Sequence, residues 1–459
     1  MLNVTSEIGT LRRVVVHAPG QEVRQMTPAL RHDLLFDDIL YHELAKHEHE
    51  AFKRLISVIV PPEEVLESAD MLRDILQDEQ TRNALVQAIC QMELAPHIDP
   101  EKFCNDMLSA DPDQLARWLI EGKPDPHRDT ELTSFLSELP YQLAPIPNLL
   151  FMRDPCAVVN DGLIVGHMAK AARRRESLLL RYIYMLHPKA GGGNGSRPPV
   201  WFDKLTPISL SNPSPLDEAA TIEGGDVLVI RPDLVLVGVS ERTSPEGVDA
   251  LARGFAAANS RVETIYAVIM PKQRSTMHLD TIFTMMSHDD LLVYPPLIMP
   301  GGGEQVGIVR IKIGRDGTTQ LQQVRKSLVD CLEEELGRPL NPVFCGGNSR
   351  LYQEREQWTD GANSFCLRPG LILGYERNEQ TYRAMEAAGY RIISEDEIVK
   401  WNVAPGAERN WVVNQPLVDE IRQHPERKYA IKISGLELSR ARGGPRCMTM
   451  PLVRDDIVW

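Results

Sequence analysis

The apolar residues of the chain follow two different patterns. No glycine occurs between Gln21 and Glu121, and residues 63–93 contain neither glycine nor proline. Apolar residues recur there at the spacing of an amphipathic helix, namely at Val65, Ala69, Leu72 and Leu76, and again at Leu85, Ala88, Ile89 and Met92. Residues 63–142 are therefore predicted to form a helical unit, which ends in the proline-containing segment 140–147.

Short β-rich runs separated by glycine and turn residues make up the chain beyond this unit. Residues 157–159 and 163–165 flank Asp161–Gly162, which predicts a β-hairpin. Residues 227–230 and 234–237 flank a second turn and predict another hairpin. The chain after the helical unit is therefore expected to combine strands with helices.

A weak internal repeat supports an α/β fold. A strand, a glycine, polar residues and a helix start recur at LIVGHMAKAARRRES (163–177), LVGVSERTSPEGV (236–248) and LILGYERNEQTYRA (371–384). Long repeats with β and α parts indicate a propeller-like arrangement around a central site. One further strand, Arg13–Val16, is predicted before the helical unit.

Composition and charge exclude several classes of protein. The 459 residues include 50 Lys and Arg against 64 Asp and Glu, a net charge of −14, which disfavours a nucleic-acid partner. No apolar run approaches about 18 residues, so no membrane span is expected. The N-terminus has no apolar signal core and carries Glu7, which predicts a cytoplasmic protein. Its seven cysteines show no C-x-x-C pair and are expected to be reduced thiols.

Cys447 is the first candidate for chemistry. A nucleophilic cysteine needs its thiolate form, and nearby cations favour that form. Arg442 and Arg446 lie close in sequence, and two adjacent glycines allow a tight approach of the backbone. The alternative is a buried structural cysteine in a C-terminal strand.

His278 and Asp280 form a second candidate, because an i, i+2 pair shares one face of an extended segment. A histidine beside a carboxylate can act as a general acid and base. A surface histidine with a salt partner is the plain alternative. A metal site is disfavoured, since no further His or Cys lies at ligand spacing.

Two other segments resemble known motifs without matching them. In the tract His42-Glu43, Lys46 stands where H-E-x-x-H needs histidine, so His47 and His49 are expected on a solvated helix face. The glycine-rich segment 190–199 lacks the spacing of a phosphate loop and is expected to be mobile.

Four acidic residues adjoin apolar strand sequences: Asp154, Glu223, Asp226 and Asp280. A buried carboxylate without a partner is costly, so each needs a positive neighbour. Either arginines of the same chain, such as Arg153, Arg173–Arg175 and Arg242, or a cationic ligand would supply it.

These motifs, taken in order, resemble the arginine deiminases of the guanidino-group-modifying superfamily. The resemblance spans essentially the whole chain, through LRRVVVHAPG (11–20), FDDIL (36–40), NLLFMRD (148–154), ARRRES (172–177), IEGGD (222–226), SERTS (240–244), MHLDTIF (277–283), REQWTDGAN (355–363), GYERN (374–378) and GGPRCMTMPL (443–452). One departure is Met152, where many members have Thr. An ordered set of this kind is far more specific than any single motif.

The resemblance implies a fold and a reaction. The fold is a pentein-like α/β propeller of five ββαβ units, formed by residues 1–62 plus 143–459, with the helical domain 63–142 inserted. The reaction is hydrolysis of L-arginine to L-citrulline and ammonia in arginine catabolism, without metal or organic cofactor. A homo-oligomer is also expected.

The resemblance further implies roles for individual residues. Asp154 and Asp280 grip the guanidinium, and Cys447 attacks its central carbon to form a covalent amidino-cysteine. His278 protonates the departing ammonia and then deprotonates water, while Glu223 supports His278.

A second group of residues is implied in substrate binding. Asn148, Arg173 and Arg242 match positions that hold the substrate α-carboxylate. Arg442 matches a mobile residue near the nucleophile. Asp226 is included with them, although it could instead only hold a turn.

Three other functions remain to be distinguished. An amidinotransferase would pass the amidino group to an amine, and a second relative would hydrolyse methylated arginine. The third is an inert arginine-binding protein, against which the intact thiol argues, because binding needs no nucleophile. Release of citrulline and ammonia from free arginine separates the deiminase from all three, whereas ornithine as product would contradict it.

Overall fold

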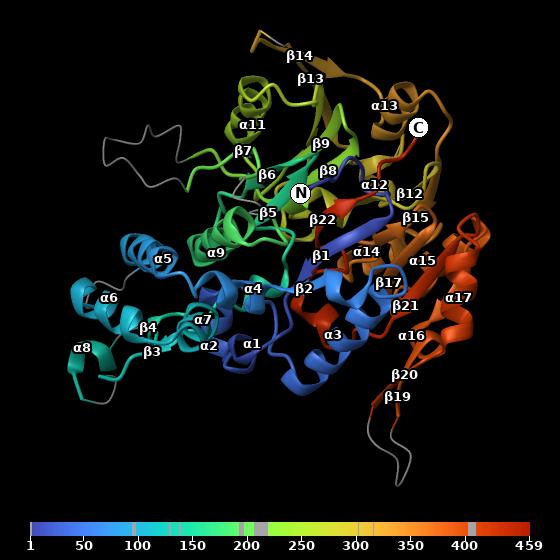
Figure 1. The fold of residues 1–459 in the computed structure, drawn as a ribbon. Coiled ribbons are helices and arrows are strands. Elements are labelled where there is room, and N and C mark those ends of the chain that lie inside the picture. Colours follow the sequence, from blue (N-terminus) through green and yellow to red (C-terminus); the bar gives the residue numbers. More distant parts are fainter. Residues whose placement is uncertain are drawn as a thin grey trace.

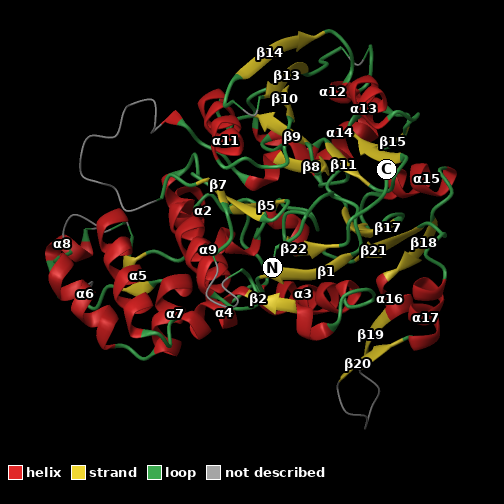
Figure 2. Cartoon of the chain, turned by 45° about the horizontal axis from the view of Figure 1, so that its top comes forward, coloured by secondary structure: helices red, strands yellow, loops and turns green. Residues whose placement is uncertain are grey.

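A computed structural model describes residues 2–93, 98–127, 130–136, 139–191, 197–205, 219–301, 303–314, 316–402 and 410–459. Within these ranges the chain has an α/β fold whose strands form several small sheets (Figures 1 and 2). No helix among the described residues is long and apolar enough to cross a membrane.

One arrangement of elements recurs four times in the described chain. Two antiparallel strands are followed by a helix and by a third strand that runs parallel to the second. The four sets are β5 (Cys156–Val159), β6 (Gly162–Val165), α9 (Arg174–Leu186) and β7 (Val200–Phe202); β8 (Val227–Arg231), β9 (Leu234–Val239), α11 (Pro245–Ala257) and β10 (Thr264–Ile269); β11 (Phe283–Met285), β12 (Asp290–Val293), α13 (Leu328–Leu336) and β15 (Asn341–Phe344); and β16 (Phe365–Arg368), β17 (Leu371–Tyr375), α15 (Glu379–Ala387) and β21 (Tyr429–Ile433). Both predicted hairpins and the strand–helix repeat are thus confirmed.

A fifth sheet of the same plan joins the two ends of the chain. β22 (Met450–Arg454) pairs antiparallel with β1 (Leu11–Val16), and β1 pairs in parallel with β2 (Val65–Glu67). The helices α1 (Gln21–Arg24), α2 (Pro28–Asp33) and α3 (His42–Ile56) lie between β1 and β2 in sequence. The N- and C-terminal segments therefore meet in one sheet (Figure 1).

The glycine-free stretch is largely helical, as predicted. It contains α4 (Ser68–Ile75), α5 (Glu79–Met92), α6 (Pro100–Ser109) and α7 (Pro112–Glu121). Beyond it, β3 (Lys123–Pro124) pairs with β4 (Tyr141–Leu143), and the short helix α8 (Leu132–Phe135) lies between these two strands in sequence. The side chains of Asp78, Asp99 and Asp111 accept backbone N–H groups at the starts of α5, α6 and α7. Val65 was wrongly placed on the helix, because it belongs to β2 and α4 begins three residues later.

Two excursions depart from the repeating plan. After β12, the short helix α12 (Pro295–Ile298) leads into the hairpin β13 (Gly307–Ile313) and β14 (Thr319–Val324), which extends the sheet of β10. After α15 come β18 (Arg391–Ser394), α16 (Glu395–Ile398), the ribbon of β19 (Val399–Asn402) with β20 (Asn410–Val413), and α17 (Gln415–Gln423). Helix α14 (Arg350–Trp358) precedes β16.

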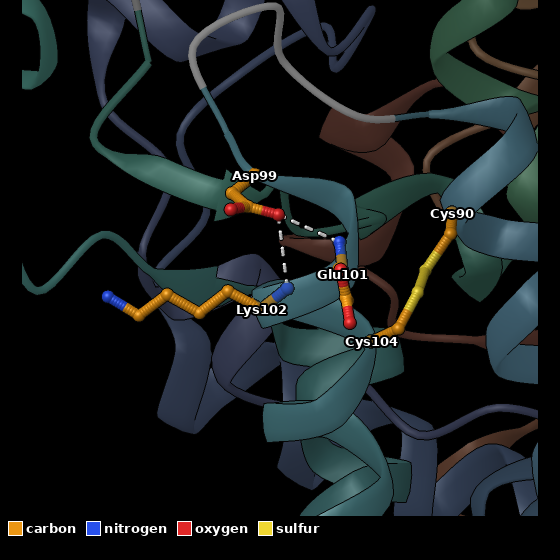
Figure 3. Close-up of a disulfide and its surroundings, with 5 residues drawn as sticks. All are labelled: Cys90, Asp99, Glu101, Lys102 and Cys104. Carbon is orange, nitrogen blue, oxygen red and sulfur yellow. Dashed lines mark hydrogen bonds between the residues drawn. A yellow bond between two sulfur atoms is a disulfide. The ribbon is translucent and has the colours of Figure 1, made fainter.

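Two expectations from the sequence are corrected by the packing. His49 does not lie on a solvated helix face, because its side chain is fully buried in the core and burial lowers its pKa to about 3. Cys90 and Cys104 are not reduced thiols, since they form a disulfide between α5 and α6 (Figure 3). Of the segment 190–199, residues 192–196 lie outside the described chain.

The disulfide gives a direct test of the helical segment. The Cys104→Ser substitution should lower the free energy of unfolding by about 2–4 kcal/mol, because it frees a loop in the unfolded chain. Denaturant unfolding of protein purified without reductant measures this loss. Reductant should lower the free energy of unfolding of the native protein by the same amount and leave that of Cys104→Ser unchanged. If reductant does not change the stability of the native protein, the disulfide does not stabilise it.

Candidate active site

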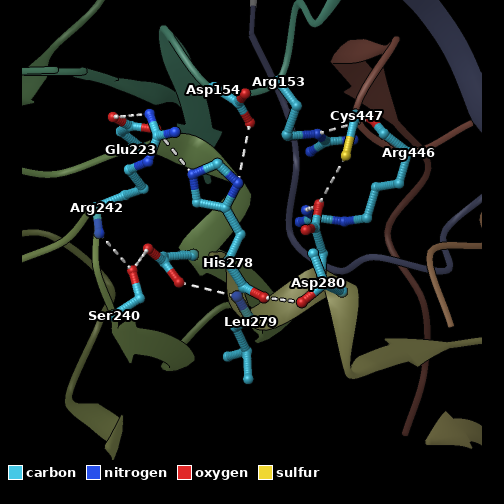
Figure 4. Close-up of polar contacts among 12 residues, drawn as sticks. Arg153, Asp154, Glu223, Ser240, Arg242, His278, Leu279, Asp280, Arg446 and Cys447 are labelled. Atoms are coloured by element: carbon cyan, nitrogen blue, oxygen red, sulfur yellow. Dashed lines mark hydrogen bonds and ion pairs between the residues drawn. The ribbon is translucent and has the colours of Figure 1, made fainter. Parts of the chain in front are cut away.

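Polar residues a few positions before the first strand of four of the five sheets lie together in the structure (Figure 4). Asp154 precedes β5, Glu223 precedes β8, His278 and Asp280 precede β11, and Cys447 precedes β22. All five side chains are buried, with Cys447 the most exposed at 5%. Equivalent positions of the repeated units therefore build one common site.

His278 lies between two carboxylates. Its Nε2 atom is 2.8 Å from Oε2 of Glu223, and its Nδ1 atom is 3.6 Å from Oδ1 of Asp154. Burial by itself would lower the pKa of His278, but the charges of Asp154 and Glu223 outweigh it and raise the pKa to about 9. The imidazole is therefore protonated at neutral pH and can donate a proton through Nδ1.

Glu223 remains ionised although it is fully buried. Burial would raise its pKa, but Arg242 and His278 lower it to about 2. The neighbouring Gly225 allows the close approach of the imidazole, because a Cβ atom there would lie 2.7 Å from the His278 ring. This contact explains why the segment IEGGD needs glycine at this position.

Cys447 faces Asp280, with 3.8 Å between its Sγ atom and Oδ2 of the carboxylate. Burial raises the pKa of the Cys447 thiol, and the negative charges of Asp280 and Asp154 raise it further. The expectation that neighbouring arginines would lower this pKa is therefore wrong. The thiol needs a cation close to these carboxylates before it can ionise at neutral pH.

The contacts of Arg446 explain why its charge does not lower the pKa of the Cys447 thiol. Its guanidinium donates to both carboxylate oxygens of Glu7, at 3.0 and 3.1 Å, and to Oδ2 of Asp280 at 2.8 Å. Arg446 and Glu7 were not recognised as a pair from the sequence, because 439 positions separate them. The pair fixes the orientation of Asp280 beside the nucleophile.

Asn363 is a second residue that the sequence interpretation missed. Its Oδ1 atom accepts the backbone N–H groups of Arg446 and Cys447, at 3.0 and 3.2 Å, and its amide nitrogen donates to the carbonyl of Asp280. The only signal for it was its place at the end of the motif REQWTDGAN. Asn363 therefore ties the nucleophile segment to the segment that carries Asp280.

Arg173 and Asn148 adjoin Asp154. Arg173 donates to Oδ2 of Asp154 at 2.7 Å, to Glu176 at 2.8 Å and to the carbonyl of Asn148 at 3.2 Å. The side-chain amide of Asn148 donates to the carbonyl of Leu34 at 2.6 Å. In this structure Arg173 therefore orients Asp154, and the Asn148 side chain is already engaged.

Among the buried polar groups with unused hydrogen-bonding capacity are those of Asp154, Asp280 and Arg242. Oδ1 of Asp154 and Oδ1 of Asp280 accept no hydrogen bond from the described residues, and Nε and Nη1 of Arg242 donate none to them. Such unsatisfied groups are costly unless a ligand completes them. Two acceptors and a cationic donor suit a ligand with a positive and a negative group.

Two predicted binding residues have other contacts. Oδ2 of Asp226 accepts from the Ser240 hydroxyl at 2.7 Å, and Oδ1 accepts from the backbone N–H of Leu279 at 2.8 Å, which supports the turn-holding alternative. Arg442 adopts φ +63° and lies with its Cζ 3.5 Å from the centroid of the Trp358 ring. Arg442 thus stacks on an indole, and its Nε donates no hydrogen bond to the described residues.

Asp154, Glu223 and His278 also present donor atoms within 4.8 Å of one another, a spacing that could hold a metal ion. Positive charge already lies against the two carboxylates, from Arg173 on Asp154 and from Arg242 at 3.7 Å from Glu223. A further dication would be repelled by both arginines. The donor set therefore favours an organic cation that shares its charge over several N–H groups.

Comparison with known proteins identifies relatives over nearly the whole chain. Residues 32–454 match the family model described as arginine deiminase. The chain is 32% identical over 463 residues to the arginine deiminase of Bacillus cereus (strain B4264), covering 99% of each, and 31% identical over 467 residues to that of Clostridium perfringens (strain SM101 / Type A), covering 99% of this chain and 98% of the relative.

Comparison with solved structures describes the fold. SxtG, an amidinotransferase from Microseira wollei in the saxitoxin biosynthetic pathway, is 13% identical and has a TM-score of 0.50, with 100% of this chain and 98% of that chain covered. This likeness describes the fold alone, and it is an α/β fold. Within that class, the chain belongs to the arginine deiminase family.

The titration of His278 tests the electrostatics of the site. Because the native pKa of about 9 lies above that of an unfolded histidine, about 6.5, the His278 contribution to stability is present at low pH and is lost as the pH rises through 9. NMR of ¹⁵N-labelled histidine, with His278 assigned from the His278→Asn variant, should show its imidazolium persisting at pH 8.

The control is Asp154→Asn, which removes one carboxylate next to the ring and should move the His278 titration to lower pH. Two results would contradict the electrostatic account: a His278 pKa near that of an ordinary histidine in the native protein, or a His278 pKa that does not change in Asp154→Asn.

Proposed function

We propose that this protein hydrolyses L-arginine to L-citrulline and ammonia, with Cys447 as nucleophile. The observation that carries the proposal is the pair of unsatisfied oxygens on Asp154 and Asp280, placed on either side of a thiol and an imidazolium. A guanidinium is planar, shares its charge and donates from several N–H groups, so it is the natural partner of two carboxylates.

Binding of the guanidinium prepares the nucleophile. The substrate cation would neutralise Asp154 and Asp280, which are the charges that hold the Cys447 pKa high. The thiol can then ionise only with a guanidinium in place.

The first half-reaction releases ammonia. The Cys447 thiolate attacks the guanidinium carbon and forms a C–S bond, while His278 gives its Nδ1 proton to the departing terminal nitrogen. The C–N bond breaks and ammonia leaves. The remaining amidino-cysteine still carries the rest of the arginine.

The second half-reaction releases citrulline. Neutral His278 takes a proton from water, which attacks the same carbon, and the C–S bond breaks to restore the Cys447 thiolate. Glu223 holds Nε2 of the ring at 2.8 Å throughout, so Nδ1 stays directed toward the reacting groups. This reaction needs neither metal nor organic cofactor.

The α-carboxylate of arginine requires a cation at the other end of the site. Arg242 is the best candidate, because its Nε and Nη1 atoms are buried and donate no hydrogen bond to the described residues. The α-carboxylate end of the substrate would also lie near Arg173, Asn148 and Arg442. These three side chains would first have to leave their present contacts with Asp154, Leu34 and Trp358. Asp226 would hold the turn that positions His278.

The proposal extends to organisation and location. The four internal ββαβ units and the fifth sheet formed by both chain ends support a five-bladed propeller, composed of residues 1–62 plus 143–459, with 63–142 as an inserted helical domain. We also expect a cytoplasmic homo-oligomer in arginine catabolism, without nucleic-acid or membrane partners.

Two variants test the reaction. Cys447→Ala should retain arginine binding, measured calorimetrically, and yield no citrulline, because the nucleophile is gone. Asp280→Asn keeps the shape but removes a charge that positions the guanidinium, so kcat/KM should fall by at least about 100-fold.

A matched control is Asp289→Asn, an exposed acid with its side chain 60% accessible, which should leave turnover unchanged. Citrulline from Cys447→Ala would refute the nucleophile. If the native protein forms ornithine and no citrulline, the assignment as a deiminase is wrong and the protein is an amidinotransferase.

A further inference from the structure

Arg173 is a guanidinium of the protein itself that already contacts Asp154, the carboxylate proposed to bind the substrate guanidinium. Its Nη1 atom donates to Oδ2 of Asp154 at 2.7 Å, while Oδ1 of this carboxylate accepts no hydrogen bond from the described residues. A guanidinium that uses two of its N–H groups on one carboxylate occupies both oxygens. Arg173 therefore competes with the substrate for Asp154, and Oδ1 is available only while Arg173 is held to a single contact.

Glu176 holds the other edge of the Arg173 guanidinium. It is the third residue of α9 and lies within the segment ARRRES (172–177). Oε2 of Glu176 accepts hydrogen bonds from Nε of Arg173 at 3.0 Å and from Nη2 at 2.8 Å. The edge formed by Nε and Nη2 is thus bound to Glu176, and Arg173 contacts Asp154 through Nη1 alone.

Burial makes the charges of this group interact strongly. Glu176 is fully buried, and Arg173 and Asp154 are each only 4% exposed. Burial by itself would lower the pKa of Arg173, but the charges of Glu176 and Asp154 outweigh it and raise that pKa. Burial raises the pKa of Glu176 to about 7, although Arg173 opposes this shift. Above that pH, Arg173 is shared between two carboxylates and compensates only part of the charge of Asp154.

We propose that Glu176 is a positioning residue, which holds Arg173 to a single contact with Asp154 and so keeps Oδ1 of Asp154 available to the substrate guanidinium. Without the charge of Glu176, Asp154 is the one carboxylate left in contact with Arg173, and Arg173 can occupy both of its oxygens. Glu176 then governs the affinity for the cationic end of the substrate without contacting it. This role rests on the proposed function, because it requires that a substrate guanidinium binds Asp154.

The binding of two ligands to Glu176→Gln tests this role. Calorimetry at pH 8, where Glu176 is ionised, compares the Cys447→Ala chain with and without the second substitution. Glu176→Gln should raise the Kd of L-arginine by about tenfold or more, because Arg173 then occupies the oxygen that the guanidinium needs. The Kd of L-citrulline should change much less, since citrulline has the same α-carboxylate but a neutral ureido group.

Two further variants separate positioning from stability. Glu176→Asp keeps the negative charge on a shorter side chain and should recover most of the affinity for arginine. Asp203→Asn is the matched control, because it removes a different ion pair of α9, in which Oδ2 of Asp203 lies 2.6 Å from Nε of Arg181. This control can lower the stability of the same helix, but it should leave the Kd of arginine unchanged.

Several outcomes would overturn the proposal. Glu176→Gln could leave the affinity for arginine unchanged, or could weaken the binding of arginine and citrulline equally, which is the result of a purely structural role. An equal loss of arginine affinity in Asp203→Asn, or no recovery in Glu176→Asp, would contradict it as well. Failure of the proposed function is a different result, because the native protein then forms no citrulline and the Cys447→Ala chain binds no arginine.

Discussion

The buried ion pair between Arg446 and Glu7 is the interaction on which the site depends. It connects the N-terminal segment to the residue directly before the nucleophile, and through Asp280 it reaches the segment that carries His278. Burial alone would raise the pKa of Glu7, yet Arg446 lowers it to about 2, so the carboxylate stays charged in the core. Removing either partner would leave an uncompensated buried charge, which is costly.

This pair also sets the charge balance that gives the site its chemistry. Because Arg446 is shared between Glu7 and Asp280, it positions Asp280 and leaves its second oxygen free. Arg173 does the same for Asp154 from the other side of the site. The protein therefore keeps two oriented oxygens that accept no hydrogen bond from the described residues, and the guanidinium of the substrate supplies the donors. The binding of a guanidinium to these two carboxylates then accounts both for substrate selectivity and for activation of the thiol.

Local patterns predicted much of the fold. The turn Asp161–Gly162 and the helical spacing around Leu85 depend on neighbours in sequence, and both predictions are confirmed. Val65 matched the helical spacing equally well, but pairing with β1 placed it in a strand. His49 was misjudged because a charged-looking helix sequence does not reveal which face packs on the core. The disulfide between Cys90 and Cys104 likewise depends on how two helices pack.

For the site, the chemical identity of the residues was predictable, and their charge states were not. Cys447, His278 and Asp280 could be selected from sequence motifs, and they lie together. The shift in the pKa of Cys447 was predicted in the wrong direction. Arg446 is adjacent to Cys447 in sequence, but its guanidinium forms ion pairs with Glu7 and Asp280. The role of Asn363 depends on backbone groups that only the folded chain brings to it.

The central claim is that a guanidinium bound between two carboxylates is attacked by Cys447 with loss of ammonia. Mass spectrometry of enzyme quenched during turnover of L-arginine tests it most directly. The account predicts an adduct on the peptide that contains Cys447, with the mass of arginine less ammonia. An adduct of the bare amidino group would mean that ornithine leaves first, and an adduct on another residue would contradict the assignment of the nucleophile.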